Sequence, residues 1–117
     1  MQEIAERYIA CWNEADPQRR RKLIDELWAE DASYVDPMAE ARGRDEIDAL
    51  VGAVQTQFPG LTFSLAGPVD THHQQARFSW ALGPAGGEPV VLGFDVAVAA
   101  EDGRLASVLG FLDKVPG

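Results

Sequence analysis

The chain has 117 residues, of which 46% are hydrophobic and 25% charged, which is enough for one globular domain with its own core. Its formal net charge of -9, from 19 acidic and 10 basic side chains, argues against nucleic acid and anionic membranes as partners, because both attract basic surfaces. No apolar run is long enough to span a bilayer, and the first residues lack the layout of a signal peptide. We therefore expect a single cytoplasmic domain over residues 1–117, in which the lone Cys11 is a small core residue rather than a nucleophile.

Three helices are predicted in the first half of the chain. Residues 3–14 carry apolar side chains at three- and four-residue spacing, and Asp16-Pro17 then provides an N-cap and a first helical residue for a second helix that runs to about Trp28. A third helix starts after Gly43 and ends at Pro59-Gly60. The basic cluster at 19–22 lies on the second helix, where we expect it to form a solvated face.

The remaining chain is typical of strands. A short extended segment at 32–35 stops at Pro37, and alternating or apolar runs follow at 61–69, 75–82, 90–99 and 104–115, separated by turn residues. Helices followed by a strand meander predict an α+β fold, with three N-terminal helices packed on one face of a strongly curved antiparallel sheet. Such a sheet would leave a pocket at its wide mouth.

Asp95 is the most informative residue of these strands. It lies in Gly93-Phe94-Asp95-Val96-Ala97-Val98, which contains no other polar side chain. The two-residue period of a strand puts Asp95 on one face with Gly93 and Ala97, whose small side chains leave space around the carboxyl. Burial there would raise the pKa of Asp95 and favour the acid form, which donates a hydrogen bond. The alternative is that Asp95 points to water from a half-buried strand.

Several short motifs occur in an order that resembles a known superfamily. They include Arg7-Tyr8, Tyr34-Val35-Asp36-Pro37, Gly43-Arg44, Phe58-Pro59-Gly60 and Gly110-Phe111-Leu112-Asp113. Together with the order of elements, they resemble the nuclear transport factor 2-like superfamily, and the SnoaL-like polyketide cyclases and ketosteroid isomerases in particular. The resemblance implies a cone-shaped, cystatin-like α+β roll, and it covers nearly the whole chain.

The resemblance also implies roles for three residues. Ketosteroid isomerases use a tyrosine of the first helix, an aspartate before a proline and an aspartate on a late strand, which match Tyr8, Asp36 and Asp95. Asp36 would then move a proton between carbons, while Tyr8 and Asp95 would hydrogen-bond the enolate oxygen. The residues fit in part, because Pro37 restricts the backbone of Asp36 and a phenol donates without becoming charged. A turn aspartate and a core tyrosine are the ordinary alternatives.

The expected site departs from those isomerases at two positions. Val51 and Leu112 stand where the isomerases carry a further tyrosine and an aromatic residue, so we expect a shorter network of donors and a substrate other than a steroid. The residues expected to contact the ligand are Trp12, Trp28, Val51, Phe58, Trp80, Gly110 and Leu112. For the three tryptophans, core packing is the alternative role.

The functional hypothesis is a pocket for a small hydrophobic carbonyl compound, in which proton transfer makes the protein a cyclase or an isomerase. A binder without turnover and a protein-interaction module, whose pocket the tryptophans would fill, are the alternatives. We expect neither a cofactor nor a metal: His72 and His73 should face opposite ways on a strand, and no second cluster of ligands occurs. An epoxide hydrolase of this superfamily would need an arginine in the site, for which Arg77 is the candidate.

The last two strands predict an assembly. If Gly93, Asp95, Gly110 and Leu112 face a cavity, alternation puts Phe94, Val96, Leu109 and Phe111 on the outer face, with Leu105 on the same side as Leu109. Such an apolar outer face needs a partner, so we expect a homodimer through the sheet, as is common in this superfamily.

Overall fold

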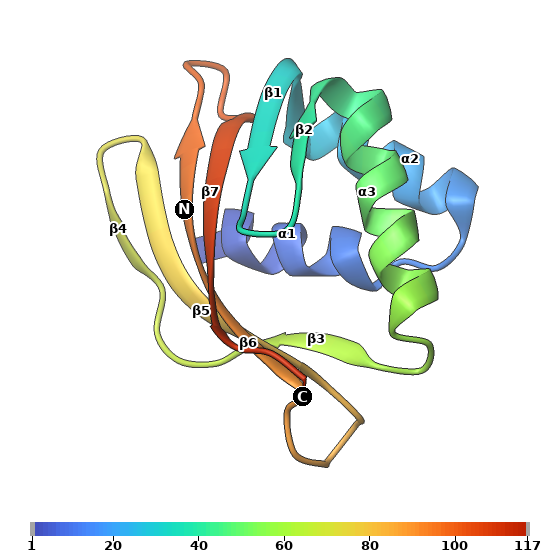
Figure 1. Ribbon diagram of the computed structural model, residues 1–117. Coiled ribbons are helices and arrows are strands. Elements are labelled where there is room, and N and C mark those ends of the chain that lie inside the picture. Colours follow the sequence, from blue (N-terminus) through green and yellow to red (C-terminus); the bar gives the residue numbers. More distant parts are fainter. Residues whose placement is uncertain (1, 117) are drawn as a thin grey trace.

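The computed structural model describes residues 2–116 and has three helices beside one seven-stranded sheet (Figure 1). The helices are α1 (Gln2–Asn13), α2 (Pro17–Leu27) and α3 (Gly43–Gln57), and all three precede most of the sheet. The strands are β1 (Trp28–Val35), β2 (Glu40–Arg42), β3 (Thr62–Leu65), β4 (Asp70–His72), β5 (Gln75–Gly83), β6 (Val91–Ala99) and β7 (Leu105–Lys114). The sheet curves around α1, so the predicted α+β fold is confirmed.

The sheet is mixed, which corrects the expectation of a wholly antiparallel one. Its strand order is β2-β1-β7-β6-β5-β3, with β4 paired to β5, and β1 runs parallel to β7. The meander from β5 to β7 is antiparallel, as tight turns require. β1 and β7 are separated by most of the chain, so no hairpin fixes their relative direction.

Several strand boundaries also differ from the prediction. β1 begins at Trp28, four residues before the predicted extended segment, because Trp28 is already extended (φ -97°, ψ 141°) and caps α2 with its backbone N–H. β2 and β4 have three residues each and were not predicted separately, since such short strands show no clear alternation. The predicted strand 61–69 is divided between β3 and the loop that leads to β4.

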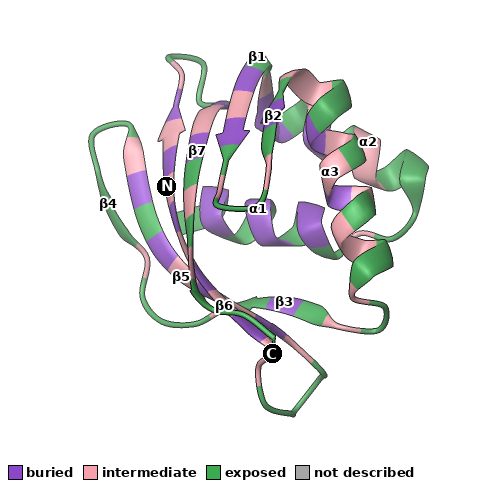
Figure 2. Cartoon of the chain, in the orientation of Figure 1, coloured by how far each residue is buried: buried purple, intermediate pink, exposed green. Residues whose placement is uncertain are grey.

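Burial alternates along β6 in the way the sequence predicts (Figure 2). Val91, Gly93, Asp95, Ala97 and Ala99 face the core, and the intervening residues are only half-buried. Asp95 is 1% exposed and is the buried charged residue of the described chain, residues 2–116. The inward orientation of its carboxyl follows directly from the period of the strand.

β7 contains an irregularity that the alternation does not predict. Ala99 pairs with Leu105 but Val98 pairs with Ser107, so the register shifts near the start of the strand. Leu105 is therefore fully buried, whereas Leu109 is 43% exposed. The expectation that Leu105 shares the outer face with Leu109 is wrong, because one extra residue inverts the alternation.

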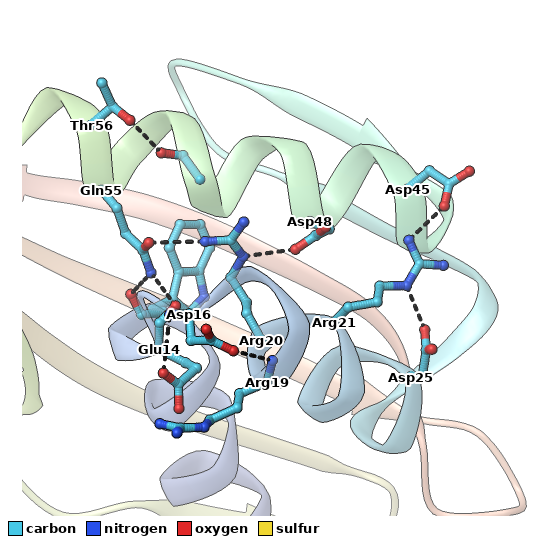
Figure 3. A network of polar contacts seen from close by, with 12 residues as sticks. Glu14, Asp16, Arg19, Arg20, Arg21, Asp25, Asp45, Asp48, Gln55 and Thr56 are labelled. Carbon is cyan, nitrogen blue, oxygen red and sulfur yellow. Dashed lines mark hydrogen bonds and ion pairs between the residues drawn. The ribbon is translucent and has the colours of Figure 1, made fainter.

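The basic cluster of α2 does more than form a solvated face (Figure 3). Arg20 Nε lies 2.7 Å from Asp48 Oδ1 and its Nη1 donates to Gln55 Oε1, both on α3, and the Arg20 side chain is only 12% exposed. Gln55 Nε2 in turn donates to the carbonyl oxygens of Trp12 and Glu14 at the end of α1. This chain of contacts fixes α1 relative to the other two helices.

Candidate functional site

One cavity of about 520 Å³ lies between the helices and the concave face of the sheet. Seventeen residues from both halves of the chain line it: Tyr8, Ile9, Trp12, Tyr34, Asp36, Met38, Val54, Gln57, Phe58, Phe63, Trp80, Leu82, Val91, Asp95, Leu112, Val115 and Pro116. Most of these side chains are aliphatic or aromatic. The cavity is therefore an apolar space with a few polar groups, which is the usual form of a small-molecule site.

Asp95 lies on the cavity wall, at the centre of β6. Burial is the main cause that raises its pKa from 3.8 to about 6, and the nearby charge of Asp36 acts in the same direction. Tyr8 and Trp80 partly lower this pKa again, because their polar hydrogens lie close to the carboxylate. Even so, Oδ1 of Asp95 has no hydrogen-bond partner of good geometry among residues 2–116. A group that titrates near neutrality in such a place is a candidate for acid–base chemistry.

Two glycines make the space that Asp95 occupies. Gly110 faces it across the β6–β7 pair, where a Cβ atom would lie 2.8 Å from Asp95 Oδ1 and 3.2 Å from Asp36 Cβ. Gly93, two residues before Asp95 on the same face, lies beneath the Trp80 indole, and a Cβ there would be 2.1 Å from Trp80 Cζ2. Neither backbone has a positive φ, so it is the lack of a side chain that matters at these positions.

Asp36 is held rigidly just after β1. Its Oδ1 accepts hydrogen bonds from the backbone N–H groups of Met38 and Ala39, both at 2.8 Å, which form a tight turn over Pro37. Its Oδ2 accepts from the Tyr34 hydroxyl at 2.6 Å. The orientation of the carboxylate is thus set before any ligand enters, as a positioned base requires.

Tyr8 is surrounded by aromatic rings. Its ring centroid lies 6.1 Å from that of Trp12, 5.9 Å from Trp28 and 5.5 Å from Phe78. Burial, and after it the charge of Asp95, raises the pKa of the Tyr8 phenol well above its usual value of 10. Tyr8 therefore stays protonated and acts as a neutral donor beside Asp95.

The structure brings together most of the residues that the sequence singled out. Tyr8, Asp36 and Asp95 all line the cavity, and so do four of the expected ligand contacts: Trp12, Phe58, Trp80 and Leu112. The other three do not line it. Trp28 and Val51 are core residues, each 1% exposed, and Gly110 backs Asp95 and Asp36 from the next strand.

Tyr34 is the residue that the sequence analysis missed. It lies next to both Asp36 and the Asp95 charge, and burial, Asp95 and Asp36 together raise the pKa of its phenol far above 10. The Tyr34 hydroxyl donates its one hydrogen to Asp36, so Tyr34 orients that carboxylate and does not replace the donor absent at Val51. The signal was present in the Tyr34-Val35-Asp36 spacing, since residues two apart in a strand share a face.

The other candidate chemistries have no support in the described residues. His72 and His73 do not face opposite ways, because His73 lies in a turn (φ 53°), and their Nδ1 atoms are 3.0 Å apart. No group of three or more potential metal ligands occurs within residues 2–116. Arg77 is exposed and pairs with Asp70 at 3.0 Å, away from the cavity. Burial raises the pKa of the Cys11 thiol to about 12, which disfavours the thiolate.

Residues 5–108 match the SnoaL-like domain. A search of curated proteins gave no match. Within the described part of the chain, no helix is long and apolar enough to span a membrane.

Solved structures show the same fold over the whole chain. A proposed isomerase of the SnoaL-like family from Agrobacterium tumefaciens is 44% identical with a TM-score of 0.91, covering 95% of each chain. A nuclear transport factor 2-like protein of unknown function from Exiguobacterium is 23% identical, with a TM-score of 0.74 over 94% of this chain and 98% of that one. A proposed polyketide cyclase from Sinorhizobium meliloti is 20% identical, with a TM-score of 0.71 over 94% of each chain. This chain therefore belongs to the SnoaL-like family.

Proposed function

We propose that the cavity binds a small, mainly apolar carbonyl compound and moves a proton next to its carbonyl group, as an isomerase or a cyclase does. The observation that carries the proposal is that Asp36, Tyr8 and Asp95, from three distant parts of the chain, line one cavity. Proton abstraction beside a carbonyl needs one base and donors for the oxygen that becomes negative, and these three residues supply both.

In the proposed reaction Asp36 is the base. Its Oδ1 accepts from two backbone N–H groups and its Oδ2 from the Tyr34 hydroxyl alone, so the remaining lone pair of Oδ2 takes the proton from carbon. Tyr8 and the acid form of Asp95 donate hydrogen bonds to the enolate oxygen. Return of the proton to another carbon gives an isomer, and attack of the enolate carbon on a second carbonyl gives a ring.

Proton exchange on a simple ketone tests this chemistry without knowledge of the natural substrate. We expect the protein to catalyse deuterium incorporation from D₂O into 2-tetralone, a bicyclic ketone, and Asp36→Asn to slow it roughly 100-fold or more, the usual contribution of a general base. Nuclear magnetic resonance of the ketone gives the rate. Asp113→Asn, which removes an exposed carboxylate of β7, is the matched control and should keep the full rate. Equal rates for both variants would contradict the role of Asp36.

A binder without turnover is the second candidate, and the same experiment separates the two. It would bind the ketone, as measured by calorimetry, without deuterium incorporation above the uncatalysed rate. The interaction module has less support, because it required the indoles to fill the pocket. Trp12 and Trp80 instead line an open cavity, and Trp28 lies in the core.

We further propose that two copies of the chain associate through the outer face of the sheet. Val35, Leu109 and Phe111 are 41%, 43% and 58% exposed, and they lie on neighbouring strands, with Val35 paired to Leu109 and Phe94 paired to Phe111. A contiguous apolar patch of this kind on a small domain is typical of an interface.

A reducing cytoplasm, in which the buried Cys11 stays a free thiol, remains our proposal for the location.

Analytical ultracentrifugation at micromolar concentration tests the dimer. We expect the mass of two chains for the unmodified protein and of one chain for Phe111→Glu, because the substitution puts a charge into the interface. Val115→Glu is the control, since Val115 is equally exposed (56%) but lies at the cavity rather than on this patch. A single-chain mass for the unmodified protein would overturn the proposal.

A further inference from the structure

A second, smaller space of about 280 Å³ adjoins the cavity, where the end of α1, the end of α3 and strand β3 meet (Figure 1). We call it the outer hollow, and the residues that line it but not the cavity are Asn13, Ala15, Gln55, Gly60, Leu61 and Thr62. Five side chains border both spaces: Trp12, Val54, Phe58, Phe63 and Leu82. A side chain that borders two spaces stands between them, so these five form the wall that divides the outer hollow from the cavity.

Hydrogen bonds keep the outer hollow open. The Asn13 side-chain amide pairs with the backbone of Phe63 as a neighbouring strand would, accepting from its N–H at 2.8 Å and donating to its C=O at 2.9 Å. The Gln55 amide of α3 donates to the carbonyl oxygens of Trp12 and Glu14, both at 2.9 Å (Figure 3). These two amides fix the ends of α1 and α3 and strand β3 relative to one another, so the space between them is part of the fold.

The outer hollow offers mainly apolar contacts to a ligand. Its lining residues, all within the range 2–116, carry no charge. Asn13 and Gln55 already use both ends of their amide groups in hydrogen bonds within the protein. Tyr8, Asp36 and Asp95 line the cavity but do not border the outer hollow. The outer hollow therefore suits an uncharged, apolar end of a ligand, away from the acid–base residues.

Phe58 is the part of the dividing wall that can move most easily. Trp12, Phe63 and Leu82 are each at most 8% exposed and belong to α1, β3 and β5. The rings of Trp12 and Phe63 also pack together, with their centroids 5.5 Å apart. Val54 is a short side chain within α3, whereas Phe58 is half-buried and follows the last residue of that helix. Rotation of the Phe58 side chain therefore opens the wall with the least loss of core packing.

We propose that the site takes an elongated ligand, whose carbonyl end lies in the cavity and whose unbranched apolar chain passes Phe58 into the outer hollow. Phe58 is then a specificity-determining residue, because an opening the width of one side chain admits a linear chain and excludes a branched one. This inference rests on the proposed function and narrows it, from small carbonyl compounds in general to neutral ketones with a linear chain.

Two ketones of the same formula test the shape of the ligand by calorimetry. 4-Pentylcyclohexanone and 4-tert-pentylcyclohexanone share the ring and the number of carbons, but only the first has a linear chain. We expect the linear isomer to bind at least tenfold more tightly, because each methylene group removed from water strengthens binding about fourfold.

The outcomes for 2-tetralone, which carries no chain, separate this inference from the proposed function. If neither 2-tetralone nor the two isomers bind, the proposed function fails and the inference fails with it. If 2-tetralone binds and the linear isomer binds no more tightly than the branched one, the proposed function stands and the inference is wrong.

Filling the outer hollow tests where the chain lies. Ala15→Phe adds a ring at the exposed rim of the outer hollow, at a residue that does not line the cavity. We expect it to weaken 4-pentylcyclohexanone about tenfold or more and to leave 2-tetralone unchanged. Ala85→Phe is the matched control, because Ala85 is exposed in the turn between β5 and β6 and borders neither space, so both affinities should stay the same. Unchanged binding of 4-pentylcyclohexanone to Ala15→Phe would overturn the inference.

Shortening Phe58 tests its role in selection. Phe58→Ala widens the opening, so we expect the preference for the linear over the branched isomer to fall several-fold. Val115→Ala is the control, since Val115 lines the cavity but not the outer hollow, and it should weaken both isomers by the same factor. Circular dichroism checks that each variant folds. An unchanged preference in Phe58→Ala would show that Phe58 does not select the ligand.

Discussion

Asp95→Asn is expected to remove a pH dependence of stability that the unmodified protein shows between about pH 4 and about pH 6. The pKa of Asp95 is about 6 in the folded protein, against 3.8 for a free aspartate. The folded protein therefore holds this proton more tightly than the unfolded chain, so the free energy of unfolding falls as the pH rises through this window and levels off above it. Burial of the charged form is the physical cause.

The expected size of this fall in unfolding free energy follows from the shift of the Asp95 pKa. Between about pH 4.5 and about pH 7.5, the unmodified protein should lose roughly 2 kcal/mol of unfolding free energy relative to Asp95→Asn. Urea unfolding at a series of pH values gives this difference, and contributions from other groups cancel between the two proteins. Asp113→Asn, at an exposed position, should run parallel to the unmodified protein. If the difference in unfolding free energy between Asp95→Asn and the unmodified protein is the same at every pH, the carboxyl is solvated and the site assignment has lost its basis.

Such a result would show a site that is maintained at the expense of stability. An apolar strand could carry a small apolar residue at position 95 with less desolvation, and at neutral pH the ionised carboxyl is the less favourable choice. Functional sites are where such exceptions are expected, because a displaced pKa is what acid–base chemistry uses.

Local patterns in the sequence predicted the elements that frame the site. Asp16-Pro17 starts α2 as expected, with the Asp16 carboxylate accepting from the backbone N–H of Arg19 at 2.9 Å. The alternation of β6 predicts which face Asp95 occupies. In both cases the deciding interaction is between near neighbours in the chain, so a short stretch of sequence contains it.

Features that depend on distant residues could not be predicted in this way. The parallel pairing of β1 with β7, the register shift that buries Leu105 and the pairing of Arg20 with Asp48 all join segments far apart in the sequence or depend on a single inserted residue. Trp28 and Val51 were assigned to the cavity, but an apolar pattern does not show which of its members face a cavity and which face the core, and Trp28 lies on β1 rather than on the predicted helix.

For the candidate site, the residues alone pointed to Asp95, and the family resemblance added Tyr8 and Asp36. Tyr34 was missed because no single motif joins it to Tyr8, and its role depends on the turn that brings Asp36 back toward β1. The contact of the Trp80 indole with Gly93 could be seen only in three dimensions, since it depends on which residue the neighbouring strand places beneath the ring.

Gly93→Ala is expected to destabilise the protein by roughly 1–3 kcal/mol, the usual cost of overpacking a well-packed core. The new Cβ would lie 2.1 Å from Trp80 Cζ2 and 2.3 Å from Cε2, so the indole would have to move away from β6. Phe63 resists that movement, because its ring centroid is 5.4 Å from that of Trp80. Urea unfolding measures the loss.

A double-mutant cycle with Trp80→Phe separates this clash from any other effect of the substitution. A phenyl ring is smaller than an indole, so Gly93→Ala should lower the free energy of unfolding less in the Trp80→Phe background than in the unmodified protein. The difference should be about 1 kcal/mol or larger. The backbone at Gly93 has a negative or extended φ, so alanine adds no backbone strain that would persist in both backgrounds. Equal costs in the two backgrounds would show that Trp80 and Gly93 are not coupled. If the coupling is found, one missing side chain on β6 determines both how the sheet packs and where the donor beside Asp95 points.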